Sequence, residues 1–142
     1  MDSDKVVLSL DESSKLINLS FKGPGQDDAE HEQMAATVKN WYEKLVAKYP
    51  DTRFKVLVDL TNAGIPNKSA TDIYTKTLSD GHISRTAFYG VGPAIKSVIN
   101  FIVSAAGKGD KVQFFIDPDK AKEWLLGLNV PTLVAPLDNP QG

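Results

Sequence analysis

The feature that most constrains the fold of this chain is a short apolar strand that lies directly after a helical pattern. Residues 54–60, with the sequence FKVLVDL, are almost continuously apolar, as is typical of a strand covered on both faces of its sheet. Before it, apolar residues recur at spacings of three and four from residue 27 to Pro50, which predicts an amphipathic helix. This order of elements favours an α/β fold with a parallel sheet.

The rest of the chain repeats the alternation of strands and helices. Residues 6–10 and 16–21 alternate between apolar and polar side chains, which predicts an antiparallel hairpin. After the central strand, Ser69 is predicted to cap a second helix, with Asp72 as its capping-box partner. The later elements are a strand at 85–91, a helix opened by Gly92 and Pro93, a strand at 111–116 and a helix capped by Asp117.

The predicted order is therefore ββαβαβαβα. We predict a single α/β domain with a mixed, mostly parallel five-stranded sheet, an antiparallel N-terminal hairpin and about four helices. The domain is predicted to span residues 1–128. Residues 129–142 contain three prolines without a usable period, so they are predicted to form a tail.

Composition restricts the functional classes. The 142 residues include 16 Lys and Arg against 18 Asp and Glu, without a basic run, so a nucleic-acid partner is not expected. The chain has no cysteine, which excludes disulfides and thiolate zinc sites and fits a cytoplasmic protein. The N-terminus does not have the pattern of a signal peptide, and no segment approaches the roughly 18 apolar residues of a membrane span.

Three phrases of the sequence carry a family resemblance. They are VLVDLT at 56–61, RTAFYGV at 85–91 and VQFFIDPDKAKEWL at 112–125. With the order of elements, they resemble the STAS-like family, the SpoIIAA-like small domains related to bacterial anti-sigma-factor antagonists. The resemblance implies a non-enzymatic regulatory or scaffolding domain that docks a protein partner.

The resemblance also implies a site. In signalling members of that family, phosphorylation of a serine at the start of the helix after the central strand controls docking. Ser69 matches that serine, and Asn67 lies near the acidic position of the family motif, although Asn-Lys-Ser-Ala stands where the family has Asp-Ser-Ser-Gly or Asp-Thr-Ser-Gly. A phosphate on Ser69 would meet free N–H groups at the helix start, but a plain capping role explains the residue equally well. The predicted partner or ligand surface comprises Asp59, Thr61, Asn62, Asn67, Lys68, Ser69, Gly90 and Gly92.

Catalytic and metal-binding alternatives have weaker patterns. Ser69, His82 and Asp59 or Asp72 supply the residue types of a hydrolase triad, but the chain lacks a Gly-x-Ser-x-Gly elbow. The two histidines do not have metal-ligand spacing, so no metal and no cofactor is predicted. The two glycines of residues 90–93 lack the other elements of a phosphate-binding loop, so backbone geometry is the preferred explanation for them.

The helix at residues 95–106 is apolar over more of its circumference than one sheet face buries, because Phe101 lies off the main stripe. The surplus predicts either a dimer or partner interface, or a cover formed by Val130, Leu133, Val134 and Leu137 of the tail. A mobile cover over an apolar groove would suit a lipid-like ligand. The alternative to protein docking is therefore a small apolar or anionic ligand, predicted in a crevice between Asp59, Asn62 and Gly92 that is lined by Phe88, Tyr89 and Tyr74.

Overall fold

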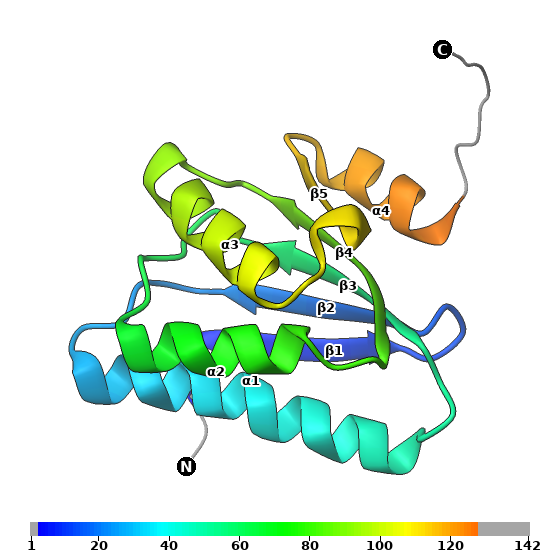
Figure 1. Cartoon of the computed structure of the whole chain (residues 1–142), viewed down its shortest axis with the longest axis horizontal. Coiled ribbons are helices and arrows are strands. Elements are labelled where there is room, and N and C mark those ends of the chain that lie inside the picture. Colours follow the sequence, from blue (N-terminus) through cyan, green and yellow to red (C-terminus); the bar gives the residue numbers. More distant parts are fainter. Residues whose placement is uncertain (1–2, 128–142) are drawn as a thin grey trace.

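The computed structural model describes residues 3–127, and these residues form one mixed sheet with helices on both faces (Figure 1). The order of elements is the predicted one. It comprises β1 (Val6–Asp11), β2 (Leu16–Phe21), α1 (Asp28–Lys48), β3 (Phe54–Asp59), α2 (Lys68–Leu78), β4 (Ile83–Tyr89), α3 (Pro93–Ala105), a 3-10 turn (Gly109–Lys111), β5 (Val112–Phe115) and α4 (Pro118–Leu126).

The strands lie side by side in the order of the sequence, β1-β2-β3-β4-β5. β1 pairs with β2 in antiparallel fashion, Leu8 opposite Leu19, and every later pairing is parallel. Successive parallel strands need crossovers, and α1, α2 and α3 supply them. The mixed five-stranded sheet with an antiparallel N-terminal hairpin is thus confirmed.

The two faces of the sheet are covered unequally. Alternate side chains of each strand point to opposite faces, so Val56 and Val58 pack on one side of β3 and Leu57 on the other. Within residues 3–127, the first face carries the larger core, against α1, α2 and α3, whereas the second packs against α4 through Ala121 and Leu125. Figure 1 shows α1 and α2 lying side by side over β1 and β2, with α3 beside them and α4 near β4 and β5.

Several local predictions were wrong in detail. Ser69 does not cap α2: Asn67 is the N-cap, and its side-chain oxygen accepts a hydrogen bond from the Ala70 N–H at 2.9 Å. Asn67 lies three residues before Ala70, the spacing at which the side chain of a cap residue reaches an unpaired N–H group of the first turn. Ser69 lies inside that turn. β4 begins at Ile83 instead of residue 85, because its pairing with β3 already starts at Phe54.

The apolar surface of α3 is divided between the core and solvent. Ile99, Ile102 and Val103 are buried and Ile95 is half-buried, which leaves Phe101, with 62% of its side chain exposed, outside the core. The predicted cover, residues 130–137 of the tail, lies outside the described residues. Within residues 3–127, no helix is both long and apolar enough to cross a membrane.

Candidate functional site

Asp59, Thr61 and Gly90 come together at the carboxyl ends of β3 and β4. Asp59 accepts hydrogen bonds from the Thr61 N–H at 2.9 Å and from the Thr61 hydroxyl at 2.6 Å, and its carboxylate lies 3.4 Å from the Ser20 hydroxyl. Gly90 has a positive φ of 73°, and a Cβ on it would lie 2.8 Å from the Thr61 backbone nitrogen. Glycine is therefore required where the two loops meet, for backbone geometry.

The electrostatics of Asp59 fit a structural role in this turn. Partial burial alone would raise the pKa of Asp59, but hydrogen bonds from Thr61, Tyr89 and Ser20 outweigh it and lower that pKa. The pKa of Tyr89 is raised, first by burial and then by the nearby Asp59 charge. Asp59 is thus an ionised, hydrogen-bonded carboxylate that holds its own loop.

The start of α2 is tied to α1 instead of to this turn. The Asn67 N–H donates to His31 Nδ1 at 3.1 Å, and the Asn67 side-chain amide donates to the Asp28 carboxylate at 3.2 Å. Lys68 pairs with Asp72 at 3.0 Å, and both Lys68 and Ser69 are exposed. His31 is therefore the residue of α1 that accepts a hydrogen bond from the backbone at the start of α2.

The residues of the hydrolase alternative are not brought together. Ser69 is the second residue of α2, whereas His82 follows the other end of that helix, which is roughly 16 Å long. His82 is engaged elsewhere: Nδ1 lies 3.2 Å from both carboxylate oxygens of Asp80, and Nε2 lies 3.0 Å from the Pro50 carbonyl oxygen. The described geometry gives no support to a triad.

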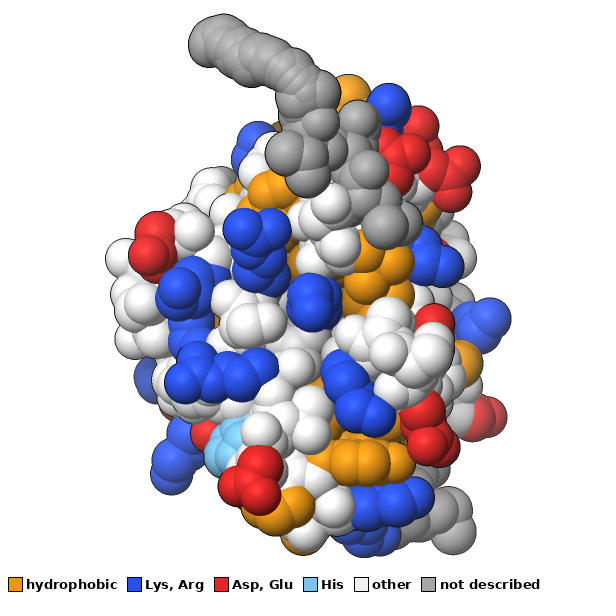
Figure 2. Space-filling model, turned by 90° about the vertical axis from the view of Figure 1, so that its right-hand side faces the viewer, with side chains coloured by type: hydrophobic (Ala, Val, Ile, Leu, Met, Phe, Trp, Pro, Cys, Tyr) orange, Lys and Arg blue, Asp and Glu red, His pale blue; other side chains and the backbone are white. Residues whose placement is uncertain are grey.

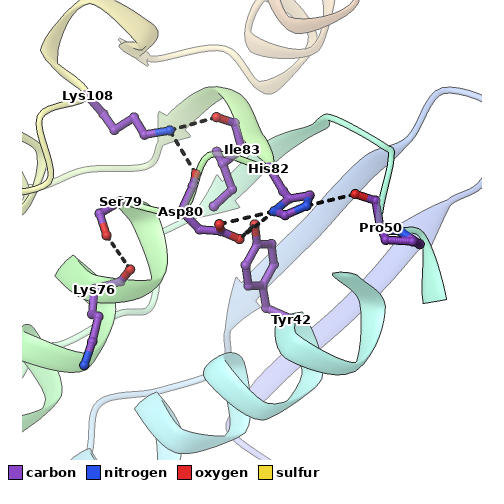
Figure 3. A network of polar contacts seen from close by, with 8 residues as sticks. All are labelled: Tyr42, Pro50, Lys76, Ser79, Asp80, His82, Ile83 and Lys108. Atoms are coloured by element: carbon purple, nitrogen blue, oxygen red, sulfur yellow. Dashed lines mark hydrogen bonds and ion pairs between the residues drawn. The ribbon is translucent and has the colours of Figure 1, made fainter. Parts of the chain in front are cut away.

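His82 belongs to a polar network that joins three segments (Figure 3). The Tyr42 hydroxyl of α1 donates to the Asp80 carboxylate at 2.5 Å, and Lys108 donates to the backbone carbonyls of Asp80 and Ile83 at 3.0 and 2.9 Å. Partial burial acts to raise the pKa of Asp80, but the hydrogen bonds from Tyr42 and His82 prevail and lower it. The network fixes the turn between α2 and β4 against the end of α1.

Basic side chains gather on the side of the molecule where α1 ends (Figure 2). Burial is the largest cause of a lowered pKa of Lys108. The nearby charge of Asp80 opposes this shift, whereas the positive charges of Lys111 and Arg53 add to it. Lys15 and Lys48 lie over the ring of Tyr49, 4.9 and 5.4 Å from its centroid. These residues come from separate segments, so the sequence contained no basic run to reveal them.

An apolar cavity lies between the sheet and the layer formed by α1, α2 and α3. It has a volume of about 130 Å³ and is partly open to solvent. Its floor is formed by side chains of β1 to β4, and its walls by α1, α2 and α3. The lining includes Leu8, Ile17, Leu19, Val56, Val58, Thr86, Phe88, Met34, Val38, Tyr42, Tyr74, Thr77, Leu78, Ile95, Ile99 and Ile102.

The segments before α1 and before α2 also contribute to the lining of this cavity. Gly25 and His31 reach it from the β2–α1 side, and Gly64 and Pro66 from the β3–α2 side. The contacts are tight: a Cβ on Gly25 would lie 2.7 Å from the His31 ring, and a Cβ on Gly64 would lie 2.5 Å from the Pro24 side chain. The hydrogen bond from Asn67 to His31 therefore spans the junction of these two segments at the cavity.

The sequence only partly anticipated this cavity. Two of the three aromatic residues predicted to line a ligand site, Phe88 and Tyr74, do line it. Tyr89, however, lies on the opposite face with Asp59, beside a smaller hollow of about 90 Å³. Asn62 and Gly92, which were predicted to flank the crevice, do not line the cavity. The feature of the sequence that pointed to the cavity was the breadth of the apolar face on α3. This helix contributes Ile95, Ile99 and Ile102 to the cavity walls.

Residues 3–127 contain no group of three or more histidine or carboxylate side chains placed to hold a metal ion.

No protein-family model matches the sequence, and no curated protein matches it significantly. The fold does match a solved structure, that of an uncharacterised protein of the DUF3478 family from Shewanella loihica PV-4, described as having a SpoIIAA-like fold. The TM-score is 0.59 at 19% sequence identity, over 88% of this chain and 98% of that one. The chain thus has the SpoIIAA-like, STAS-like α/β fold.

Proposed function

We propose that this domain binds a small, mainly apolar molecule in the cavity between its sheet and the layer of α1, α2 and α3. The observation that carries the proposal is the cavity of about 130 Å³ with its almost wholly apolar lining. Protein interiors normally leave few voids larger than a water molecule, and apolar cavities of about this size stay dry and bind compounds such as benzene. Binding, without a chemical step, is the activity that the lining supports.

The charge of the lining narrows the ligand class. The lining includes no Lys, Arg, Asp or Glu side chain. An anion in the cavity would lose its hydration without gaining an ion pair, which costs several kcal/mol. The sequence predicted a small apolar or anionic ligand as the alternative to protein docking. The lining of this cavity favours the apolar ligand over the anionic one.

Thermal unfolding with compact apolar compounds, such as toluene, tests the proposal. A ligand that binds only the folded state at 100 times its Kd adds about 2.7 kcal/mol to the unfolding free energy, so the Tm should rise by several degrees. Ile99→Trp fills the cavity from α3 and should abolish this rise. Phe101→Trp is the matched control, since Phe101 is exposed on the same helix. The proposal fails if no compact apolar compound raises the Tm, or if Ile99→Trp responds as the parent protein does.

Protein docking at the start of α2 is the second candidate function. It is favoured by the likeness to the SpoIIAA-like fold and by the exposure of Lys68, Ser69 and the neighbouring Ile65, whose side chain is 51% exposed. A phosphate on Ser69 would lie beside the first N–H groups of α2, where a negative charge is favourable. In this second proposal, Ser69 is the phosphorylation site, and the surface from Ile65 to Ser69 is the contact with the partner.

A further inference from the structure

Tyr74 brings a free hydrogen-bonding group to the apolar cavity. The residue lines the cavity and lies on α2 between Ala70 and Leu78, which are buried and lie about one turn before and one turn after it on the same face of the helix. Its ring packs edge to face against the ring of Phe21, another lining residue, with 6.0 Å between the centroids. The side chain of Tyr74 is therefore directed from α2 towards the sheet.

The hydroxyl of Tyr74 lies inside the protein without a partner there. No hydrogen bond joins it to any other of residues 3–127, and burial is the sole cause of the raised pKa of Tyr74. The oxygen nevertheless retains accessible surface, in contrast to the hydroxyl oxygen of Thr86, which is fully enclosed. Tyr74 thus keeps its proton at neutral pH and can donate it to a molecule that enters the cavity.

Three other polar side chains of the lining are already engaged. The Thr77 hydroxyl donates to a backbone carbonyl oxygen of its own helix at 2.9 Å, and the Tyr42 hydroxyl donates to the Asp80 carboxylate. His31 accepts a backbone N–H through Nδ1, and its Nε2 lies against Gly25, where a Cβ would lie 3.0 Å from it. These groups contribute shape to the cavity, and their hydrogen bonds are made within the chain.

The indole N–H of Trp41 is a second free donor of the lining. Trp41 is half-buried on α1, and no hydrogen bond joins it to another of residues 3–127. An indole N–H can only donate, so a carbonyl oxygen is the neutral acceptor that either Trp41 or Tyr74 could serve. Because burial raises the pKa of Tyr74, its polar atom lies in surroundings where a hydrogen bond is stronger than in water. Tyr74 is therefore the donor to which we assign the contact.

We infer that the cavity selects a compact, neutral carbonyl compound, whose apolar ring or short chain fills the cavity and whose oxygen accepts a hydrogen bond from the Tyr74 hydroxyl. The inference rests on the proposed function and specifies its ligand class. The volume of about 130 Å³ sets the size, since a cavity of roughly 150 Å³ accommodates benzene. The lining has no Lys, Arg, Asp or Glu side chain, which sets the neutrality, and the free donor sets the acceptor.

Cyclohexanone and methylenecyclohexane provide the test, by calorimetric titration of the full chain, because they differ only in the replacement of a carbonyl oxygen by a CH₂ group. Tyr74→Phe removes the hydroxyl and keeps the ring. We expect it to weaken cyclohexanone binding about five-fold, the size of one net hydrogen bond, and to leave methylenecyclohexane binding unchanged or tighter. Tyr49→Phe is the matched control, since Tyr49 lies at the C-terminal end of α1 and outside the lining. It should change neither affinity.

Two further measurements examine the assignment to Tyr74. Trp41→Phe removes the other donor and alters the shape of the cavity, so it should change the affinities of both compounds by a similar factor. A loss confined to cyclohexanone in Trp41→Phe would overturn the role of Tyr74. Without ligand, Tyr74→Phe should unfold at the same Tm as the parent protein or at a higher one, because the hydroxyl has no partner to lose. A clear fall in this Tm would contradict the inference.

The outcomes separate this inference from the proposed function. If Tyr74→Phe binds both compounds as the parent protein does, the role of Tyr74 is overturned while the cavity remains a ligand site. If the parent protein binds neither compound nor any other compact apolar molecule, the proposed function fails and the inference fails with it.

Discussion

His82 is the residue whose state depends most directly on pH. Both of its ring nitrogens face acceptors, the Asp80 carboxylate and the Pro50 carbonyl oxygen, so both contacts are hydrogen bonds only in the imidazolium form. The hydrogen bond to Asp80 is the main cause of a raised His82 pKa, and the one to Pro50 adds to it. Three further groups lie around Asp80 and His82. The Tyr42 hydroxyl donates to the Asp80 carboxylate, and Lys108 donates to the Asp80 backbone carbonyl oxygen. The positive charge of Arg53 disfavours the protonated form of His82 and so acts to lower its pKa.

A stability change with pH follows from this arrangement. Because the pKa of His82 is higher in the folded state, its contribution is complete below the unfolded value of about 6.5 and is lost as pH rises through the folded pKa. The Tm of the parent protein relative to His82→Gln should therefore fall between slightly acidic and slightly alkaline pH. NMR titration should give His82 a pKa above its ordinary value, and Asp80→Asn should lower it. A His82 pKa at or below the ordinary value in the parent protein would contradict this account.

At the N-terminus of α2, the residue that caps the helix lies two positions before the residue that the sequence predicted as the cap. Asn67, at the N-cap, has extended backbone geometry and accepts the Ala70 N–H, while Ser69 lies inside the helix with an exposed side chain. Asn67 also links the helix to α1 through His31 and Asp28. The cap therefore holds both the helix and the loop beside the cavity.

Substitution of the cap tests this assignment. Asn67→Ala should reduce the unfolding free energy by about 1 kcal/mol or more, because it removes the cap and the contacts with α1. Ser69→Ala is the control at the residue predicted from the sequence to be the cap, and it should change stability by no more than about 0.5 kcal/mol. Chemical denaturation of both variants measures the difference. Equal losses in the two variants would show that Ser69 contributes to the cap.

For the molecule as a whole, the unequal covering of the sheet is the decisive feature. Three helices cover the face that holds the large core and the cavity, while α4 packs against a smaller cluster on the other face. The cavity lies where side chains from seven of these elements, β1–β4 and α1–α3, converge. Lys68 and Ser69, at the exposed start of α2, do not line the cavity, so a substitution at Ser69 tests partner docking without changing the lining.

Native mass spectrometry of the whole protein from its source organism addresses both candidate functions at once. The docking proposal predicts a co-purifying protein, together with a phosphate mass increment that is lost in Ser69→Ala. The ligand proposal predicts a small-molecule increment that is lost in Ile99→Trp and retained in Phe101→Trp. A bare, unmodified chain that binds no partner in such an experiment would count against docking.

The sequence was sufficient to predict the order of elements and the mixed sheet. Periodicity reports the local geometry of each segment, and FKVLVDL at 54–60, read with its flanking helices, identified the centre of the sheet. Residue types that favour helix starts also correctly predicted Gly92 and Pro93 at the start of α3 and Asp117 as the cap of α4. Such signals lie within a few residues of one another, so they can be read without knowing the fold.

The tertiary structure alone decided where the binding space lies. His82 and Ser69, which the catalytic alternative placed together, are at opposite ends of α2, and Phe88 and Tyr89, which the ligand alternative grouped, point to opposite faces of β4. Whether the lining residues of a cavity meet depends on how separate elements pack. A single sequence records the side chains of each element but not the space that remains between them.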